Sequence, residues 1–213
     1  DALIMRTMTN FIGEVLGGAA PGIRSVNLYA GFKTTFPATT VTPEAALTDP
    51  AFIRYATMQI KMYSDRMERI STLFNAGGKE RFTSKDLQHV VLLSEFSAAA
   101  STYLLSDTQN KDMVTLIDHE TVPYWQGSGK TYGFADTSAI SVKTASGKTI
   151  KRAGIIGIIF DRDALGVTNL DRRVTTNYNA RAEFYTNFYK FDAGYYNDLD
   201  ENFVVFTVEA VGE

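Results

Sequence analysis

The last 60 residues constrain the fold most strongly, because strand-forming segments follow one another there with little between them. Residues 154–160 form an apolar run interrupted by glycine, and residues 203–208 form a second apolar run. Residues 184–196, which lie between them, are rich in Phe and Tyr. Since aromatic side chains fall on both faces of the strand predicted at 184–191, we expect that strand to be covered on both sides.

An amphipathic helix is predicted over residues 1–16, where apolar residues recur every three or four positions. Gly17 and Gly18 follow and are typical of a helix end. The apolar face of this helix comprises Ile4, Met8, Phe11, Ile12 and Val15.

A second helix is predicted from Pro50 to the glycine pair at 77–78, because Asp49 is a suitable N-cap and proline is favoured at the first helical position. Its apolar stripe comprises Ile53, Ala56, Ile60, Tyr63, Met67, Ile70 and Phe74. Asp65 and Arg69 can pair one turn apart. Such a stripe suits either a coiled-coil partner helix or a helix packed on the protein's own sheet, and we favour the second interpretation.

The remaining segments complete an α+β pattern, in which helices come first, strands come late and no regular βαβ alternation occurs. The other predicted elements are a strand within 23–32, a loop at 34–48, strands at 89–93 and 114–117, a helix at 95–105, and a hairpin of 140–143 with 149–151 around a turn at 145–148.

Charge and cysteine content disfavour several classes of function. Twenty-one basic and 24 acidic residues give a net charge of −3, so no general electrostatic attraction to nucleic acid or to an anionic membrane is expected. The chain has no cysteine, which excludes disulfides and thiolate chemistry.

No apolar run approaches the roughly 18 residues of a membrane span, and no signal-peptide pattern is present. Because Asp1 stands inside a predicted helix, we expect an N-terminal portion to be missing.

One glycine-rich segment imitates a phosphate-binding loop but lacks its pattern. Residues 127–131 read Gly-Ser-Gly-Lys-Thr, yet the position that must hold the first Walker glycine is Tyr124. The segment also lacks the preceding strand and following helix that let backbone amides surround a phosphate. We interpret it as a surface loop and predict no nucleotide cofactor.

Carboxylates near the end of the chain imitate a calcium-binding loop. Asp198, Asp200, Asn202 and Glu209 occupy ligand positions, but the sixth position, which requires glycine for a sharp turn, is Phe203. The predicted strand that follows would carry Glu209 away from the other carboxylates. We therefore interpret the segment as a polar turn and predict no metal site.

Other polar candidates are isolated in the sequence. Asp161 and Asp163 lack an identifiable third ligand for a cation, so solvent or a nearby arginine is their expected partner. His89 and His119 belong to no metal-ligand spacing. No Gly-x-Ser-x-Gly motif is present, although catalytic triads assemble in space and not in sequence. We predict no catalytic, cofactor-binding or metal-binding residues, and no enzymatic activity.

A modest basic cluster has the charge and the neighbouring aromatic residues for contact with nucleic acid. Its members are Lys148, Lys151, Arg152, Arg172 and Arg173. Because Asp161, Asp163 and Asp171 lie among them in the sequence, we favour a mixed-charge surface at a subunit boundary.

Four segments together resemble a known protein family. They are residues 54–78 (RYATMQIKMYSDRMERISTLFNAGG), 124–127 (YWQG), 154–169 (GIIGIIFDRDALGVTN) and 172–206 (RRVTTNYNARAEFYTNFYKFDAGYYNDLDENFVVF). These strings resemble major capsid proteins of tailed bacteriophages and of prophages in Gram-positive bacteria, whose fold is the Hong Kong 97-type capsid fold. The resemblance extends over nearly the whole chain.

The resemblance implies a division into domains. Residues 1–22 would belong to the peripheral domain, as the end of its spine helix. Residues 23–150 would form mainly the axial domain, and residues 151–213 would be strands that return to the peripheral domain. The N-terminal arm and the extended hairpin loop that family members carry before the spine helix would be absent.

The resemblance also implies a function. The protein would be a structural component of the virion, assembled in the bacterial cytoplasm into hexamers and pentamers of an icosahedral head around double-stranded DNA. Its partners would be copies of itself, a scaffold, a portal and a head-processing protease, with indirect contact to DNA and none to membrane. The alternatives are an encapsulin-like or other phage assembly protein on the same fold, and a hydrolase whose site is assembled in space.

Overall fold

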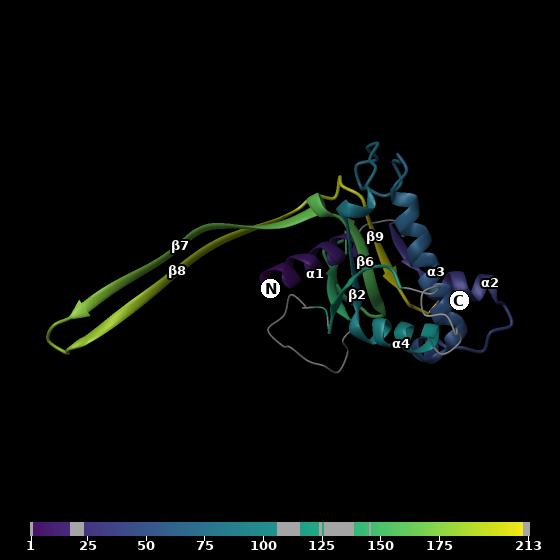
Figure 1. The fold of residues 1–213 in the computed structure, drawn as a ribbon, viewed down its shortest axis with the longest axis horizontal. Helices are drawn as coiled ribbons and strands as arrows, with labels where there is room; N and C mark the ends of the chain where they lie inside the picture. The colour runs from purple at the N-terminus through teal and green to yellow at the C-terminus, as the bar shows by residue number, and fades with distance from the viewer. Residues whose placement is uncertain are drawn as a thin grey trace.

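The protein forms a five-stranded mixed sheet covered on both faces, from which a long two-stranded hairpin projects (Figure 1). The structure, a computed structural model, describes residues 2–17, 24–105, 116–123, 125, 139–144 and 146–210. Helices precede most of the strands along the chain, which confirms the expected α+β class.

The central strand of the sheet is β6 (Ile155–Asp161), which is buried along its whole length. It pairs antiparallel with β2 (Gln88–Leu93) on one side and with β9 (Phe203–Thr207) on the other. Two short parallel strands form the edges, β1 (Ser25–Asn27) beside β9 and β3 (Glu120–Val122) beside β2. The three inner strands all match predicted ones, and their apolar runs are continuous because both faces of the sheet are covered.

Helices cover one face of the sheet, and a helix with a small hairpin covers the other. The first layer contains α2 (Leu28–Thr35), α3 (Pro50–Met67) and α4 (Ser94–Leu105). The second layer contains α1 (Ala2–Gly17), β4 (Ile140–Lys143) and β5 (Thr149–Arg152). The predicted helices at 1–16 and 95–105 and the predicted hairpin at 140–151 are thereby confirmed.

Alternate residues of β9 enter two separate hydrophobic cores. Val204 and Phe206 are buried in the core beneath α2, α3 and α4, while Phe203 and Val205 are buried in the core beneath α1 and β4. Side chains alternate between the faces of a strand, so one short strand stabilises both layers. The sheet contains strands that precede residue 150 in the sequence and strands that follow it. The domain boundary proposed at residue 150 remains a prediction.

Helix α3 begins where the sequence predicts. The carboxylate of Asp49 accepts hydrogen bonds from the backbone N–H groups of Ala51 at 2.7 Å and Phe52 at 2.9 Å, which caps the first turn. The helix packs on the protein's own sheet and not in a coiled coil, because Ile53 and Ile60 are fully buried in the core.

The predicted end of this helix is wrong. The helix stops at Met67, whose carbonyl accepts a hydrogen bond from the N–H of Thr83 at 2.8 Å, and the chain continues as a loop. Phe74 reaches the core from this loop, while Ile70 is exposed. The predicted pair of Asp65 with Arg69 does not form, because Asp65 binds Lys85 at 2.6 Å instead.

Three other predictions need correction. The strand expected within 23–32 is limited to β1, since the side chain of Asn27 caps α2 immediately afterwards. The loop expected at 34–48 contains a 3-10 helix over Pro43–Thr48. Of the strand expected at 114–117, only residues 116 and 117 are described, and they are not in a strand.

The projecting hairpin is the largest departure from the predictions. It consists of β7 (Leu165–Asn179) and β8 (Phe184–Asn197), which pair only with each other (Figure 1). With 15 residues in β7, the hairpin is roughly 45–50 Å long at about 3.3 Å per residue. We expected the aromatic strand at 184–191 to be covered on both sides. Within a single chain, this prediction is wrong. The chain thus contains an extended hairpin, which lies between the central strand β6 and strand β9.

Candidate interaction surfaces

One face of the β7–β8 hairpin is lined with exposed apolar side chains, most of them aromatic. The register places Val174 opposite Tyr189 and Tyr178 opposite Tyr185, with Phe191 next along the same face. We call these five residues the aromatic face. Tyr189 is 78% exposed and Tyr185 is 68% exposed. The polar pair of Thr176 and Asn187 lies between the two apolar pairs on this face, with Thr176 Oγ1 donating to Asn187 Oδ1 at 2.8 Å. Exposed apolar side chains gathered on one face in this way are typical of an interaction surface.

The opposite face of the hairpin is more polar. Lys190 Nζ lies 2.9 Å from Asp192 Oδ2, and the cross-strand neighbour of Lys190 is Arg173. Two aromatic residues, Phe184 and Phe188, also lie on this face, but their cross-strand partners are Asn179 and Thr175. A partner that covers the aromatic face therefore buries mostly apolar surface.

Few contacts within the hairpin compensate for its isolation. The rings of Tyr178 and Tyr185 lie 4.7 Å apart, and the guanidinium of Arg172 lies 5.4 Å from the ring centre of Phe191. An isolated two-stranded hairpin is marginally stable at best in water. We therefore expect the hairpin to become more ordered when a partner buries the aromatic face.

The root of the hairpin is fixed to the body. Asn197 Nδ2 donates to Glu14 Oε2 at 2.5 Å, which ties β8 to α1. The N–H of Asp198 donates to the carbonyl of Ala164 at 2.6 Å and closes the base of the hairpin. These contacts set the direction in which the hairpin leaves the body.

A second exposed apolar surface lies on the loop after α3. Ser71 and Arg81 form a backbone bridge across this loop, with N–O distances of 3.0 and 3.1 Å. Ile70 and Phe82, which flank the bridge, are 74% and 57% exposed, and Leu73 is 54% exposed. We call Ile70, Leu73 and Phe82 the loop patch. The sequence assigned Ile70 to the buried stripe of a helix, so the loop patch was not predicted.

The loop that carries this patch is held in place by the turn between β8 and β9. Lys79 Nζ lies 2.5 Å from Asp200 Oδ2, and the N–H of Ala76 donates to the carbonyl of Leu199 at 2.7 Å. Because both contacts join segments distant in the sequence, the loop presents its apolar side chains in a defined orientation. A preorganised surface loses less conformational entropy on binding.

Glu201 lies in this turn, and its carboxyl group has a raised pKa. Burial raises the pKa of Glu201 above its ordinary value of 4.5, and the guanidinium of Arg81, 2.9 Å away, opposes the rise. The carboxylates of Asp161, Asp198 and Asp163 raise this pKa further through charge repulsion.

Replacing Glu201 by glutamine is expected to change how stability depends on pH. The folded protein holds the Glu201 proton more tightly than the unfolded chain does. The stability that this proton contributes is therefore fully present below the unfolded pKa of 4.5 and is lost as pH rises through the folded pKa. As pH increases, the unfolding free energy of the unchanged protein should therefore fall relative to that of Glu201→Gln. Urea titrations between about pH 4 and 8 can measure this change.

Arg81→Gln provides the matched test of this prediction. Since Arg81 lowers the pKa of Glu201, its removal should move the loss of stability to higher pH. The unfolding free energies of Glu201→Gln and of the unchanged protein could instead differ by the same amount at every pH. That result would contradict the raised pKa of Glu201.

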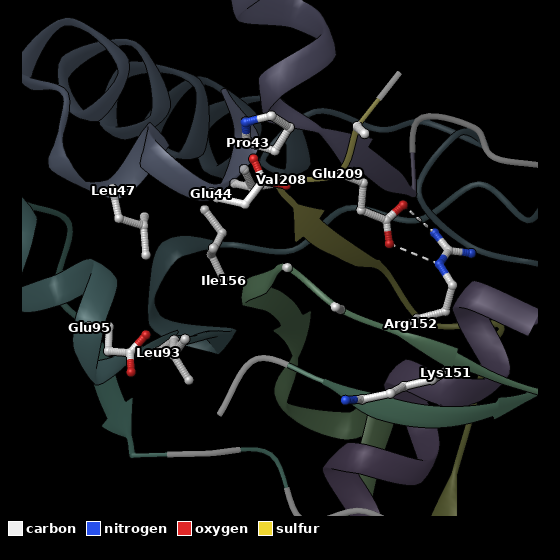
Figure 2. A pocket seen from close by; sticks show the side chains of 13 residues that line it. Pro43, Glu44, Leu47, Leu93, Glu95, Lys151, Arg152, Ile156, Val208 and Glu209 are labelled. Atoms are coloured by element: carbon white, nitrogen blue, oxygen red, sulfur yellow. Dashed lines mark hydrogen bonds and ion pairs between the residues drawn. The ribbon is translucent and has the colours of Figure 1, made fainter. Parts of the chain in front are cut away.

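A cavity of about 570 Å³ opens at one end of the sheet (Figure 2). Leu47, Leu93 and Ile156 contribute apolar lining. On its wall, Arg152 and Glu209 point toward one another and form two bonds, Nε–Oε1 at 2.9 Å and Nη2–Oε2 at 2.7 Å. This bidentate geometry is that of a strong ion pair between a guanidinium and a carboxylate.

The candidate ligands of the calcium-like segment have separate partners in the structure. Glu209 lies at the cavity, Asp200 binds Lys79, and Asn202 is buried with its amide donating to Thr83 Oγ1 at 3.2 Å. Asp161 is buried as well and accepts a hydrogen bond from Thr83 Oγ1 at 2.6 Å. Within the described ranges, no three His, Asp or Glu side chains converge on a possible ion. The interpretation as a polar turn agrees with this arrangement.

The two histidines have separate structural surroundings. The ring of His89 stacks on Phe160, with centroids 5.6 Å apart. His119 Nε2 lies 2.8 Å from Ser97 Oγ, and its Nδ1 lies 2.7 Å from the carbonyl of Ile117. A serine beside a histidine resembles part of a catalytic triad, but a backbone carbonyl occupies the place of the acid.

The basic cluster is divided between two hairpins. Lys148, Lys151 and Arg152 belong to or adjoin the β4–β5 hairpin, while Arg172 and Arg173 lie on β7. Arg152 is neutralised by Glu209, and Arg172 lies over an aromatic ring.

The phosphate-loop candidate at 127–131 lies outside the described residues. In the part of the chain that is described, no helix is long and apolar enough to cross a membrane.

The sequence of β7 carries only a partial sign of the aromatic face. Val174 and Tyr178 fall on one face of the strand, but Thr176 between them is polar, so the alternation typical of a strand with one apolar face is incomplete. The neighbouring strand β8 hides the pattern, because its aromatic residues fall on both faces.

Comparisons with protein families and with solved structures give matches, whereas one comparison does not. A search of curated proteins found no match. Solved structures that match include a chain in the capsid structure of Staphylococcus phage Andhra, with 10% identity and a TM-score of 0.43. That match covers 74% of this chain and 53% of the other, so the chain spans about half the length of that relative. The family model of Phi29-like phage major capsid proteins matches residues 5–207, and the chain therefore belongs to this family.

Proposed function

We propose that this chain is the structural subunit of an icosahedral phage head, in which copies associate as hexamers and pentamers around double-stranded DNA. The observation that carries the proposal is the aromatic face, which the described part of its own chain leaves exposed on a projecting hairpin. Family membership gives the chain a structural role in a phage capsid. A protein that associates by symmetry can bury such a surface in every copy.

The charge of the chain suits this role. A net charge of −3 gives no general attraction to nucleic acid, and a shell must contain DNA without binding it tightly. Under this proposal, residues 1–22, 23–150 and 151–213 contribute to the peripheral, axial and returning peripheral parts of a Hong Kong 97-type fold. The scaffold, portal and head-processing protease are further proposed partners, and the bacterial cytoplasm is the proposed place of assembly.

An assembly experiment on the full-length protein tests the proposal. We expect shell-sized particles in electron micrographs and in light scattering, and nuclease-protected DNA in particles purified from infected cells. Particles that enclose a cargo protein in place of DNA would favour the encapsulin-like alternative. A protein that remains monomeric at all concentrations would contradict the proposed function.

A further inference from the structure

Ser97 and His119 form a hydrogen-bonded pair between α4 and the chain that precedes β3. The distance from Ser97 Oγ to His119 Nε2 is 2.8 Å, and the distance from His119 Nδ1 to the carbonyl oxygen of Ile117 is 2.7 Å. From this geometry we propose that Ser97 is a nucleophile with His119 as its general base, and that Ser97 accepts acyl groups from activated esters. Such a reaction is independent of assembly and goes beyond the structural role proposed above.

Two parallel strands bring the serine and the histidine together. Strand β2 pairs in parallel with β3, and His119 directly precedes the first residue of β3. Helix α4 begins at Ser94, directly after the last residue of β2, and carries Ser97 in its first turn. The serine is thus held by a helix, and the histidine is anchored by the strand that follows it.

The contact of His119 Nδ1 with a carbonyl determines where the imidazole carries its proton. A carbonyl oxygen only accepts hydrogen bonds, so Nδ1 carries the proton and donates to Ile117. In the neutral imidazole, Nε2 then has a free lone pair and accepts a hydrogen bond from the hydroxyl of Ser97. A histidine in this arrangement can take the proton of a serine hydroxyl, which activates the serine as a nucleophile.

Two other hydroxyl groups of α4 have ordinary helical partners. Ser101 Oγ donates to the carbonyl of Ser97 at 2.9 Å, and Thr102 Oγ1 donates to the carbonyl of Ala98 at 2.9 Å. Both bonds reach back four residues within the helix, which is a common pattern for serine and threonine. Ser97 differs because its hydroxyl contacts a base, and Ser101 therefore provides a matched control in the same helix.

The pair is accessible from solvent. Ser97 and His119 are half-buried, and Ala98 and Ser101 are exposed near Ser97 on the same helix. Since both of these neighbours are small, they leave room for a small ester to approach the hydroxyl of Ser97.

The reaction needs no reactant other than the ester. Ser97 Oγ attacks the carbonyl carbon of the ester while His119 Nε2 takes the hydroxyl proton. A bond forms between Oγ and the acyl carbon, the bond from that carbon to the leaving oxygen breaks, and His119 gives the proton to the leaving oxygen or to solvent. Each ester molecule that reacts yields one acylated Ser97 and one free alcohol or phenol.

Labelling with p-nitrophenyl acetate, an activated ester, tests the proposal on the unassembled full-length protein. Mass spectrometry of peptides measures how much acetyl group each serine has gained at successive times. We expect Ser97 to be acetylated at least about a hundredfold faster than Ser101, because general-base catalysis typically contributes about 10²–10⁴-fold. Both serines are compared in one sample of the unchanged protein, so the result does not depend on the folding of a variant.

Replacing His119 by glutamine separates basicity from hydrogen bonding. A glutamine amide can accept a hydrogen bond from Ser97 but is not a base, so acetylation of Ser97 should fall to the rate of Ser101 while circular dichroism stays unchanged. The control Ser101→Ala should leave the acetylation rate of Ser97 unchanged.

Two outcomes would overturn the proposal. One is equally slow acetylation of Ser97 and Ser101 in the unchanged protein, and the other is rapid acetylation of Ser97 that persists in His119→Gln. Either result would leave the proposed capsid role intact, because particle formation does not depend on this reaction.

Discussion

Replacing Tyr185 and Tyr189 together by serine is expected to prevent assembly while leaving the body of the protein folded. Both side chains are mostly exposed in the single chain, so their removal leaves no cavity in either core. In an assembled particle, buried aromatic residues of this kind each contribute about 2 kcal/mol or more. Because each 1.4 kcal/mol corresponds to about a tenfold change in affinity, the double variant should associate at least about a hundredfold more weakly.

Sedimentation velocity measures the association, and circular dichroism measures the folding of the same samples. The matched control is Phe184→Ser with Phe188→Ser, which removes two aromatic residues from the opposite face of the same strand. We expect this control to associate much more strongly than the double tyrosine variant. Equal loss of assembly in both variants would show that the hairpin acts through its general stability and not through the aromatic face.

Replacing Phe206 by alanine is expected to reduce the free energy of unfolding by about 3–5 kcal/mol. Phe206 is fully buried in β9, next to the central strand, and its ring lies 5.7 Å from that of Tyr63 on α3. The substitution removes apolar burial and leaves a cavity that the sheet and helices cannot close completely. Since domains of this kind have a total stability of about 5–15 kcal/mol, the change is a large fraction of the whole.

Urea denaturation followed by circular dichroism measures this effect on the unassembled protein. Phe184→Ala, on the exposed hairpin, is the control and should change the free energy of unfolding by about 0.5 kcal/mol or less. A loss below about 1 kcal/mol for Phe206→Ala would mean that the core beneath α3 is not packed as the structure shows.

Features that depend on neighbouring residues follow from the sequence. The start of α3 is an example, because Asp49 caps the helix through backbone groups only two and three residues away. The inner strands are another, since uninterrupted apolar runs have few stable environments other than a sheet covered on both faces. The family resemblance also follows from the sequence, because it rests on long strings of residues.

Features that depend on distant residues do not follow from the sequence. The apolar stripe of α3 continues past Met67, yet the helix ends there because the chain turns back and Thr83 binds the last carbonyl. This turn is held by contacts with the segment after β8, which periodicity cannot reveal. The loop patch exists only because of that turn, so no local pattern predicts it.

The aromatic strand β8 shows most clearly where sequence and tertiary structure each decide the outcome. Its residues specify a strand, since Phe, Tyr and Thr favour extended backbone. Whether other parts of the chain cover that strand depends on where its ends are anchored. Asn197 is tied to Glu14 and Asp198 to Ala164, so the hairpin leaves the body at its root and none of the described core reaches its outer half. The sequence therefore determines an aromatic strand, and the tertiary structure decides that the described part of the chain leaves much of it exposed.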